Sequence, residues 1–201
     1  MTRGRKKQYQ KEEVLLKAMD VFWRKGYEGA HLKELVEHTG LNRFSLYSEF
    51  DGKEGLFCEA LAQYLVMARE VYNQQLASSP ANVGNIYQYF ASIGFGDDYH
   101  GCMMVNTLNN RHGVPQKAFE MVSDFIQWVR GLYLENLKAE VEQGRILASS
   151  PIESWCDVLL SFDVGLSISG VAFNKINGGI MAKQVLDALL ATHQVPVNDT
   201  F

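Results

Sequence analysis

The stretch that decides the fold is residues 26–57, which read GYEGAHLKELVEHTGLNRFSLYSEFDGKEGLF. Two short segments with helical spacing of apolar residues, 32–38 and 43–49, are separated by the turn Thr39-Gly40. Glycine suits such a turn because it adopts the left-handed backbone conformation that other residues avoid. Two short helices joined by a glycine turn and followed by a longer helix indicate a helix-turn-helix unit.

Apolar residues recur at helical spacing along most of the remaining chain, and glycine, proline and asparagine break it into segments. No segment has the alternating pattern of a strand. Together with the two short helices above, we predict helices over residues 11–25, 53–76, 82–93, 102–111, 115–143, 152–174 and 179–192. The predicted fold is therefore all-α, with a three-helix head over residues 1–52 and a six-helix body over residues 53–201 that includes the fourth helix.

Charge is divided unevenly along the chain. The net charge is −4, yet residues 1–53 carry 11 Lys and Arg against 8 Asp and Glu, and residues 54–201 carry 8 against 15. A basic arm, with Arg3, Arg5, Lys6 and Lys7, precedes the first helix. A basic head on an acidic body favours a head that faces phosphates, and the arm is a candidate for contacts with phosphates or the minor groove.

The cysteines and the catalytic motifs that the sequence lacks restrict the class of protein further. The three cysteines, Cys58, Cys102 and Cys156, form no C-x-x-C pair, so neither a disulfide framework nor a zinc site is expected and a reducing cytoplasm is the natural compartment. The N-terminus lacks the apolar stretch of a secretory signal, and residues 158–173 look too polar and too short to span a bilayer. No nucleophile motif, phosphate-binding glycine loop or metal-ligand spacing is present, so we expect no enzyme, cofactor or metal.

The stretch 26–57 resembles the TetR/AcrR family of bacterial repressors. The matching parts are G-Y-E at 26–28, T-G-L at 39–41, L-Y-x-x-F at 46–50 and K-E-x-L-F at 53–57, and residues 101–107 are similar to a segment of one branch of that family. The resemblance implies a cytoplasmic DNA-binding transcriptional regulator, more commonly a repressor. Such a protein binds a palindromic double-stranded operator as a homodimer and is released by a small-molecule effector.

Candidate DNA contacts gather on the second short helix. Arg43, near its start, can pair with the O6 and N7 atoms of guanine in the major groove. The resemblance gives Tyr47 and Lys53 the role of phosphate contacts, and Leu46 and Phe50 are expected in the core. The predicted DNA-binding set is His31, Lys33, Asn42, Arg43, Phe44, Ser45, Tyr47, Ser48 and Lys53.

Three residues depart from the family pattern. Ala30 stands where the family usually has a Thr or Ser that caps the second helix and touches phosphate, so His31 or Lys33 would have to supply that contact. Phe44 replaces a residue that is usually small and could meet a thymine methyl. Glu49 places an acid on or near the DNA face.

The body is expected to sense a ligand and to dimerise. An apolar effector pocket is predicted near Met67, Phe90, Cys102, Met103, Asn106, Phe125 and Trp128. The last two helices are expected to form the dimer interface, with close approach at Gly165, Ser167, Ser169 and Gly170 and apolar area from Leu159, Leu160, Phe162, Leu166, Leu186, Leu189 and Leu190. Two alternatives stay open: a redox or electrophile sensor that uses Cys102 with the same head, and a helical ligand-binding protein that no longer binds DNA.

Overall fold

The computed structural model describes residues 9–96, 98–173 and 176–191. Within these residues the regular structure is helical throughout, so the all-α prediction is confirmed. The helices are α1 (Lys11–Gly29), α2 (Leu32–Thr39), α3 (Arg43–Phe50), α4 (Gly52–Gln75), α5 (Val83–Ser92), α6 (Met103–Asn109), α7 (Gln116–Glu142), α8 (Ile152–Ala172) and α9 (Gly178–Leu190). Each corresponds to one predicted helix, whereas the basic arm at Arg3–Lys7 lies outside the described residues.

The described residues form two compact units. The first unit combines residues 9–67 with residues 103–123, and the second combines residues 68–102 with residues 124–191. The two longest helices, α4 and α7, therefore each contribute one part to each unit. The division into a DNA-binding domain over residues 1–52 and a sensing domain over residues 53–201 stays a prediction about function.

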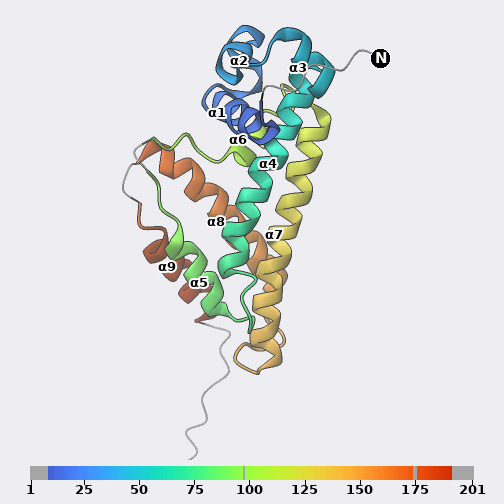
Figure 1. Ribbon diagram of the computed structural model, residues 1–201. Coiled ribbons are helices and arrows are strands. Elements are labelled where there is room, and N and C mark those ends of the chain that lie inside the picture. The colour runs from blue at the N-terminus through green and yellow to red at the C-terminus, as the bar shows by residue number, and fades with distance from the viewer. Residues whose placement is uncertain (1–8, 97, 174–175, 192–201) are drawn as a thin grey trace, which may run out of the picture. The chain divides into compact units, whose positions relative to one another are not determined.

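In the first unit, α1, α2 and α3 surround the first half of α4, and α6 lies against α1 (Figure 1). The helices form because each presents an apolar face to a common centre, and burial of such side chains drives their packing. The largest side chains that are fully buried in this unit are Phe22, Leu35, Leu46, Leu56 and Leu61. Leu46, which the sequence assigns to the core, is confirmed there, as is the neighbouring Phe50.

Two glycines shape this unit. Gly26 has φ 69° and interrupts α1, where the sequence predicts the end of the first helix; a short further turn runs on to Gly29. Gly40 has φ 75° and ends α2 in the left-handed conformation. Both positions favour glycine because a Cβ atom makes this backbone region costly.

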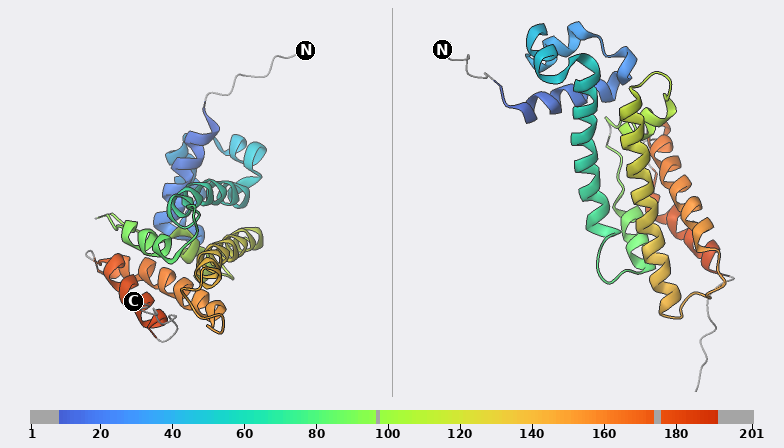
Figure 2. Two further views of the ribbon diagram at one scale, coloured as in Figure 1. Left: turned by 90° about the horizontal axis from the view of Figure 1, so that it is seen from below. Right: turned by 90° about the vertical axis from the view of Figure 1, so that its right-hand side faces the viewer.

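In the second unit, α5 and α9 pack side by side, and α8 runs beside the second half of α7 (Figure 2). Arg130 on α7 joins these two helices, with its guanidinium 2.6 Å from Asp157 and 3.0 Å from Glu153 on α8. The start of α5 is held by α7, where the buried Asn136 accepts from the Asn82 amide N–H at 2.9 Å and Glu140 accepts from that of Val83 at 2.9 Å.

The helix α8 is long and apolar, and it matches the helix predicted over residues 152–174. It runs over 21 residues and is, by length and composition alone, able to cross a membrane. That residues 158–173 do not span a bilayer stays a prediction. However, α8 carries the buried Asp163 inside the second unit, which is the pattern of a core helix with one apolar outer face.

Candidate nucleic-acid interface

The turn between α2 and α3 is built from local hydrogen bonds. The Gly40 N–H donates to the Val36 carbonyl at 3.1 Å, which closes the end of α2. The Thr39 hydroxyl donates to the Leu35 carbonyl at 2.5 Å and accepts from the Leu41 N–H at 3.3 Å. Leu41 is buried, so the chain is anchored on both sides of the turn and the direction of α3 is fixed.

The helix α3 is capped as the sequence predicts. The Asn42 side chain accepts a hydrogen bond from the Ser45 N–H at 2.8 Å, which satisfies a donor that the first turn of a helix leaves free. With Leu46 and Phe50 buried on one side, the other side of the helix faces outward.

The outward side of α3 presents the predicted contact residues. Arg43 and Ser48 are exposed, and Phe44 and Tyr47 are 81% and 52% exposed. The exposed ring of Phe44 is placed where it can contact a thymine methyl. The arrangement of a guanidinium, an aromatic ring and two hydroxyls on one exposed helix face suits a major groove.

Lys53, at the start of α4, is held in place by the end of α1. Its ammonium lies 4.6 Å from the centre of the Tyr27 ring and donates to the Glu28 carbonyl at 3.4 Å. Burial lowers the pKa of Lys53, and the nearby Glu28 partly offsets this effect. A lysine that is oriented before it meets DNA loses less side-chain freedom on binding a phosphate.

The start of α2 carries the first departure from the family pattern. Ala30 is buried, and His31 stands at the N-cap without a side-chain hydrogen bond to the helix. His31 and Lys33 are both exposed, and among the described residues Lys33 makes a long ion pair of 3.8 Å with Glu37. Both side chains are therefore available for the phosphate contact that Ala30 cannot make.

The predicted effector residues are distributed over both units. Met103 and Asn106 line a cavity of about 30 Å³ in the first unit, together with Trp23, Tyr27 and Phe57. Met67 is exposed at the end of that unit's part of α4. The remaining four, Phe90, Cys102, Phe125 and Trp128, belong to the second unit.

Within the second unit the structure brings two of the predicted residues together. The rings of Phe125 and Trp128 lie 5.1 Å apart, and the guanidinium of Arg69, which the sequence interpretation missed, lies 3.9 Å from the centre of the Trp128 ring. Phe90 is fully buried and packs against Tyr133 and Phe162.

The sequence interpretation also missed a buried polar centre in the second unit. Asp163 on α8 accepts hydrogen bonds from the hydroxyls of Tyr72, Tyr89 and Tyr133 at 3.0–3.1 Å. Burial raises the pKa of Asp163 to about 6, and the three tyrosine hydroxyls limit the rise. Its one signal in the sequence is an acid within an apolar helix, since the three tyrosines are dispersed over 62 residues.

The outer faces of α8 and α9 differ in part from the predicted dimer surface. Leu159, Leu166, Leu186 and Leu190 are buried within the subunit, because helical spacing turns them inward, and the ring of Phe95 lies over Gly170. The apolar residues that do face outward on these helices and just beyond α8 are Val158, Ile168, Val171, Phe173, Ile180 and Met181.

The three cysteines are not in disulfides. Cys58 and Cys156 are buried, and burial raises the pKa of the Cys156 thiol to about 11. Cys102 is partly exposed and lies near Tyr72 and Tyr99. Within the described part of the chain, no group of three or more His, Cys, Asp or Glu side chains could hold a metal ion.

A helix-turn-helix unit with an exposed polar and aromatic face on an all-α chain defines the class of DNA-binding regulatory proteins. Comparisons with known proteins agree. The family model described as "Bacterial regulatory proteins, tetR family" matches residues 14–60. The HTH-type transcriptional repressor ComR of Escherichia coli is 33% identical over 138 residues, which are 59% of this chain and 66% of ComR. The aligned part is thus just under two thirds of that relative.

Solved structures give the same result over most of the chain. The TetR family transcriptional regulator CifR, solved as a cysteine mutant with 26-base-pair double-strand operator DNA, matches with a TM-score of 0.75 and 28% identity, covering 93% of this chain and 99% of CifR. A TetR family regulator from Cytophaga hutchinsonii has the same fold, with a TM-score of 0.76 and 16% identity over 92% of this chain and 94% of that one. The chain therefore has the fold of TetR family regulators, and its residues 14–60 match the DNA-binding segment of that family.

Proposed function

We propose that this protein is a cytoplasmic repressor that binds a palindromic operator as a homodimer. The observation that carries the proposal is the outward face of α3, where Arg43, Phe44, Tyr47 and Ser48 are exposed together. Lys53 stands at the start of the next helix, in the place of the family's phosphate contact. The operator complex of CifR and the repressor name of ComR support this reading.

A homodimer is supported by the apolar residues that α8 and α9 leave exposed. Ile168 and Ile180 are 54% and 60% exposed, and apolar side chains gathered on one surface are typical of a subunit interface. A two-fold dimer would present two copies of α3 to successive major grooves, roughly 34 Å apart.

Effector release is the second part of the proposal. A ligand that binds the DNA-free conformation better than the DNA-bound one would lower operator affinity by that difference. The aromatic residues Phe125 and Trp128, with Arg69 beside them, are the strongest candidates for ligand contact in the second unit. We assign no catalytic activity to the chain.

The direct test is selection of random duplex DNA by the purified protein at two salt concentrations. We expect enrichment of a palindrome and an affinity that falls steeply with salt, because each neutralised phosphate releases counterions. Weak binding at low salt with no enriched sequence would contradict the proposal and favour a helical ligand-binding protein that has lost DNA binding.

Cys102 supports a second candidate for the regulatory input. It is the one partly exposed thiol among the three cysteines, all of which the structure describes. An electrophile or oxidant that modified it could release the operator without a reversible ligand. If labelling of Cys102 leaves operator affinity unchanged, this input is excluded; loss of affinity that a Cys102→Ser variant resists would establish it.

A further inference from the structure

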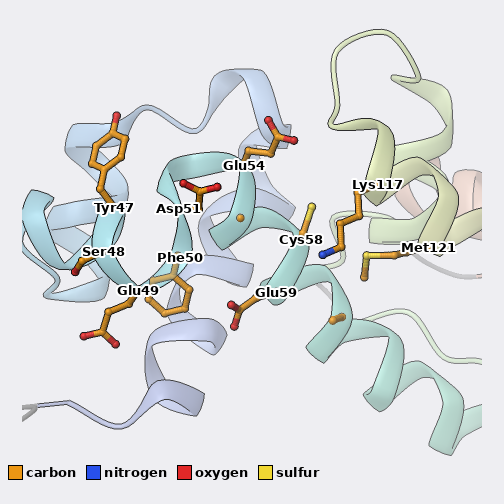
Figure 3. A pocket seen from close by; sticks show the side chains of 12 residues that line it. Tyr47, Ser48, Glu49, Phe50, Asp51, Glu54, Cys58, Glu59, Lys117 and Met121 are labelled. Carbon is orange, nitrogen blue, oxygen red and sulfur yellow. The ribbon is translucent and has the colours of Figure 1, made fainter.

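An open groove lies beside α3 in the first unit. It has a volume of about 710 Å³ and lies between the end of α3, the start of α4 and the start of α7 (Figure 3). Phe50, Ala62 and Met121 give it apolar walls. Four carboxylates line it, from Glu49, Asp51, Glu54 and Glu59, against a single cationic side chain, that of Lys117. We call this feature the acidic groove.

Helix stability explains some of these acids but not Glu49. Asp51 ends α3 with φ 57° and stands directly before α4, and Glu54 lies in the first turn of α4, where the helix dipole favours acids. Glu49 lies in the last turn of α3, where the partial negative charge of the helix end disfavours an acid. Among the described residues, no cation lies within ion-pair distance of Asp51 or Glu54.

The chain already places a lysine at the edge of the groove. The Lys11 ammonium lies 2.6 Å from the Glu59 carboxylate and 5.6 Å from the centre of the Phe50 ring. In this contact the Glu59 carboxylate binds the charged group, and the Phe50 ring packs against the side chain. Carboxylates and aromatic rings together bind the charged and the apolar parts of lysine and arginine side chains. The groove therefore fits basic side chains.

The described chain also begins at this edge. Tyr9 precedes α1, and burial together with the facing Glu49 carboxylate raises the pKa of Tyr9 to about 12. The eight residues before Tyr9 lie outside the described part and carry Arg3, Arg5, Lys6 and Lys7 with no acid. Eight residues can reach about 27 Å when extended, which is ample for a groove that begins where they end.

We propose that the basic arm, residues 1–8, binds in the acidic groove when DNA is absent, so that the carboxylates of α3 and α4 compete with DNA phosphates for it. The groove is lined by Tyr47 and Ser48 as well, the same residues assigned to the DNA face. The contact would weaken binding to all DNA alike, because an arm held by carboxylates must be released before it can meet phosphates. This last consequence rests on the proposed DNA binding, whereas the contact itself does not.

Proteolysis without DNA tests the contact directly. Trypsin cuts after Arg3, Arg5, Lys6 and Lys7, and the rate can be followed by mass spectrometry of the intact chain. The variant Glu49→Gln with Asp51→Asn removes two carboxylates at positions that tolerate the change, since asparagine accepts the left-handed conformation of Asp51. We expect arm cleavage about two- to fivefold faster than in the unaltered chain at low salt, and equal rates at high salt.

The matched control is Glu34→Gln with Glu37→Gln, which removes two acids of α2 that lie outside the groove. This variant should be cut at the rate of the unaltered chain. Equal rates for all three proteins at low salt would overturn the proposal. A cleavage rate that rises on dilution would also overturn it, because the arm would then come from a second copy.

Operator binding gives an independent measurement. In the chain with its arm intact, Glu49→Gln with Asp51→Asn should increase operator affinity. The same two changes should give a smaller gain in a chain whose four arm cations are changed to Gln. Equal gains in both chains would mean that the carboxylates act on DNA directly, and would overturn the competition. Failure of every protein to bind an operator would contradict the proposed function, while the proteolysis would still decide the contact.

Discussion

At the residue scale, Arg43 and Lys53 are expected to act differently on DNA. Arg43 is exposed at the first turn of α3 and makes no ion pair among the described residues, so it can meet a base edge. Lys53 is held beside Tyr27, in a position that suits a phosphate. One residue would read sequence, and the other would set affinity for all sequences.

The variant Arg43→Ala should weaken operator binding by about 1–3 kcal/mol and relax the preference at one base pair. Lys53→Ala should weaken binding to all duplexes alike and reduce the salt slope by about 1. Titrations of selected and scrambled duplexes at several salt concentrations measure both effects. Lys17→Ala, which removes a cation paired with Glu13 on α1, is the control. Operator binding by both variants that matches the unaltered chain would refute this docking of α3.

Tyr27 is expected to position Lys53 for that contact. Tyr27→Phe keeps the ring beneath the ammonium and should leave the salt slope unchanged, whereas Tyr27→Leu removes the ring and should lower operator affinity about two- to fivefold. In a Lys53→Ala background the same Tyr27→Leu change should have little further effect. Additive losses in the double variant would show that Tyr27 supports the fold and not the lysine.

Asp163 makes stability depend on pH in an unusual direction. Its folded-state pKa of about 6 lies above the ordinary value of 3.8, so the folded chain takes up a proton more readily than the unfolded one. The contribution of Asp163 to the free energy of unfolding is therefore highest below about pH 4. This contribution falls by about 2–3 kcal/mol as the pH rises through 6. Paired acids such as Glu140 and Asp157, whose pKa values are lowered, act in the opposite direction.

Denaturant unfolding at pH 4.5 and 7 measures this contribution. Asp163→Asn should remove it, so that the variant gains less, or loses more, stability than the unaltered chain when the pH is lowered. Asp124→Asn, at an exposed position of α7, is the matched control and should follow the unaltered chain. A pH profile of Asp163→Asn that coincides with that of the unaltered chain would rule out a proton on Asp163 in this range.

At the scale of elements, local signals in the sequence were sufficient to place the helices. Asn42 predicts the start of α3 because a short polar side chain can cap a helix, and the structure records that bond. Gly26 and Gly40 predict two ends because few other residues adopt their backbone conformation. The pattern could not show which leucines of α8 and α9 face inward, since both helices are apolar over much of their circumference.

The outer faces of α8 and α9 predict how subunits associate. Replacing Ile168 and Ile180 by Asp puts charges on surfaces that are exposed in the subunit, so folding should persist while a dimer dissociates. Sedimentation or light scattering would measure the mass, and operator affinity should fall with it. Val66→Asp, at an equally open apolar position of α4, should leave the mass unchanged. A variant that kept the mass of the unaltered protein would place the interface elsewhere.

At the scale of the whole molecule, the sequence did not predict which residues distant in the chain contact one another. The hydroxyls of Tyr72, Tyr89 and Tyr133 come from three different helices, and no local pattern predicts that they meet on Asp163. The acidic groove likewise joins residues of α3 and α4 to Lys117 on α7. The predicted effector residues also belong to both units, and no local pattern in the sequence indicates this division.

The first unit is discontinuous in sequence, since residues 103–123 belong with residues 9–67. Met103, Asn106 and Thr107 close the cavity whose other wall is formed by Phe22, Tyr27 and Phe57. A chimaera that transplanted the N-terminal segment alone onto another regulator would therefore leave one side of that aromatic group bare. Exchange of DNA specificity between relatives should succeed only when both stretches travel together, or when the recipient supplies its own matching cover for the ring of Tyr27.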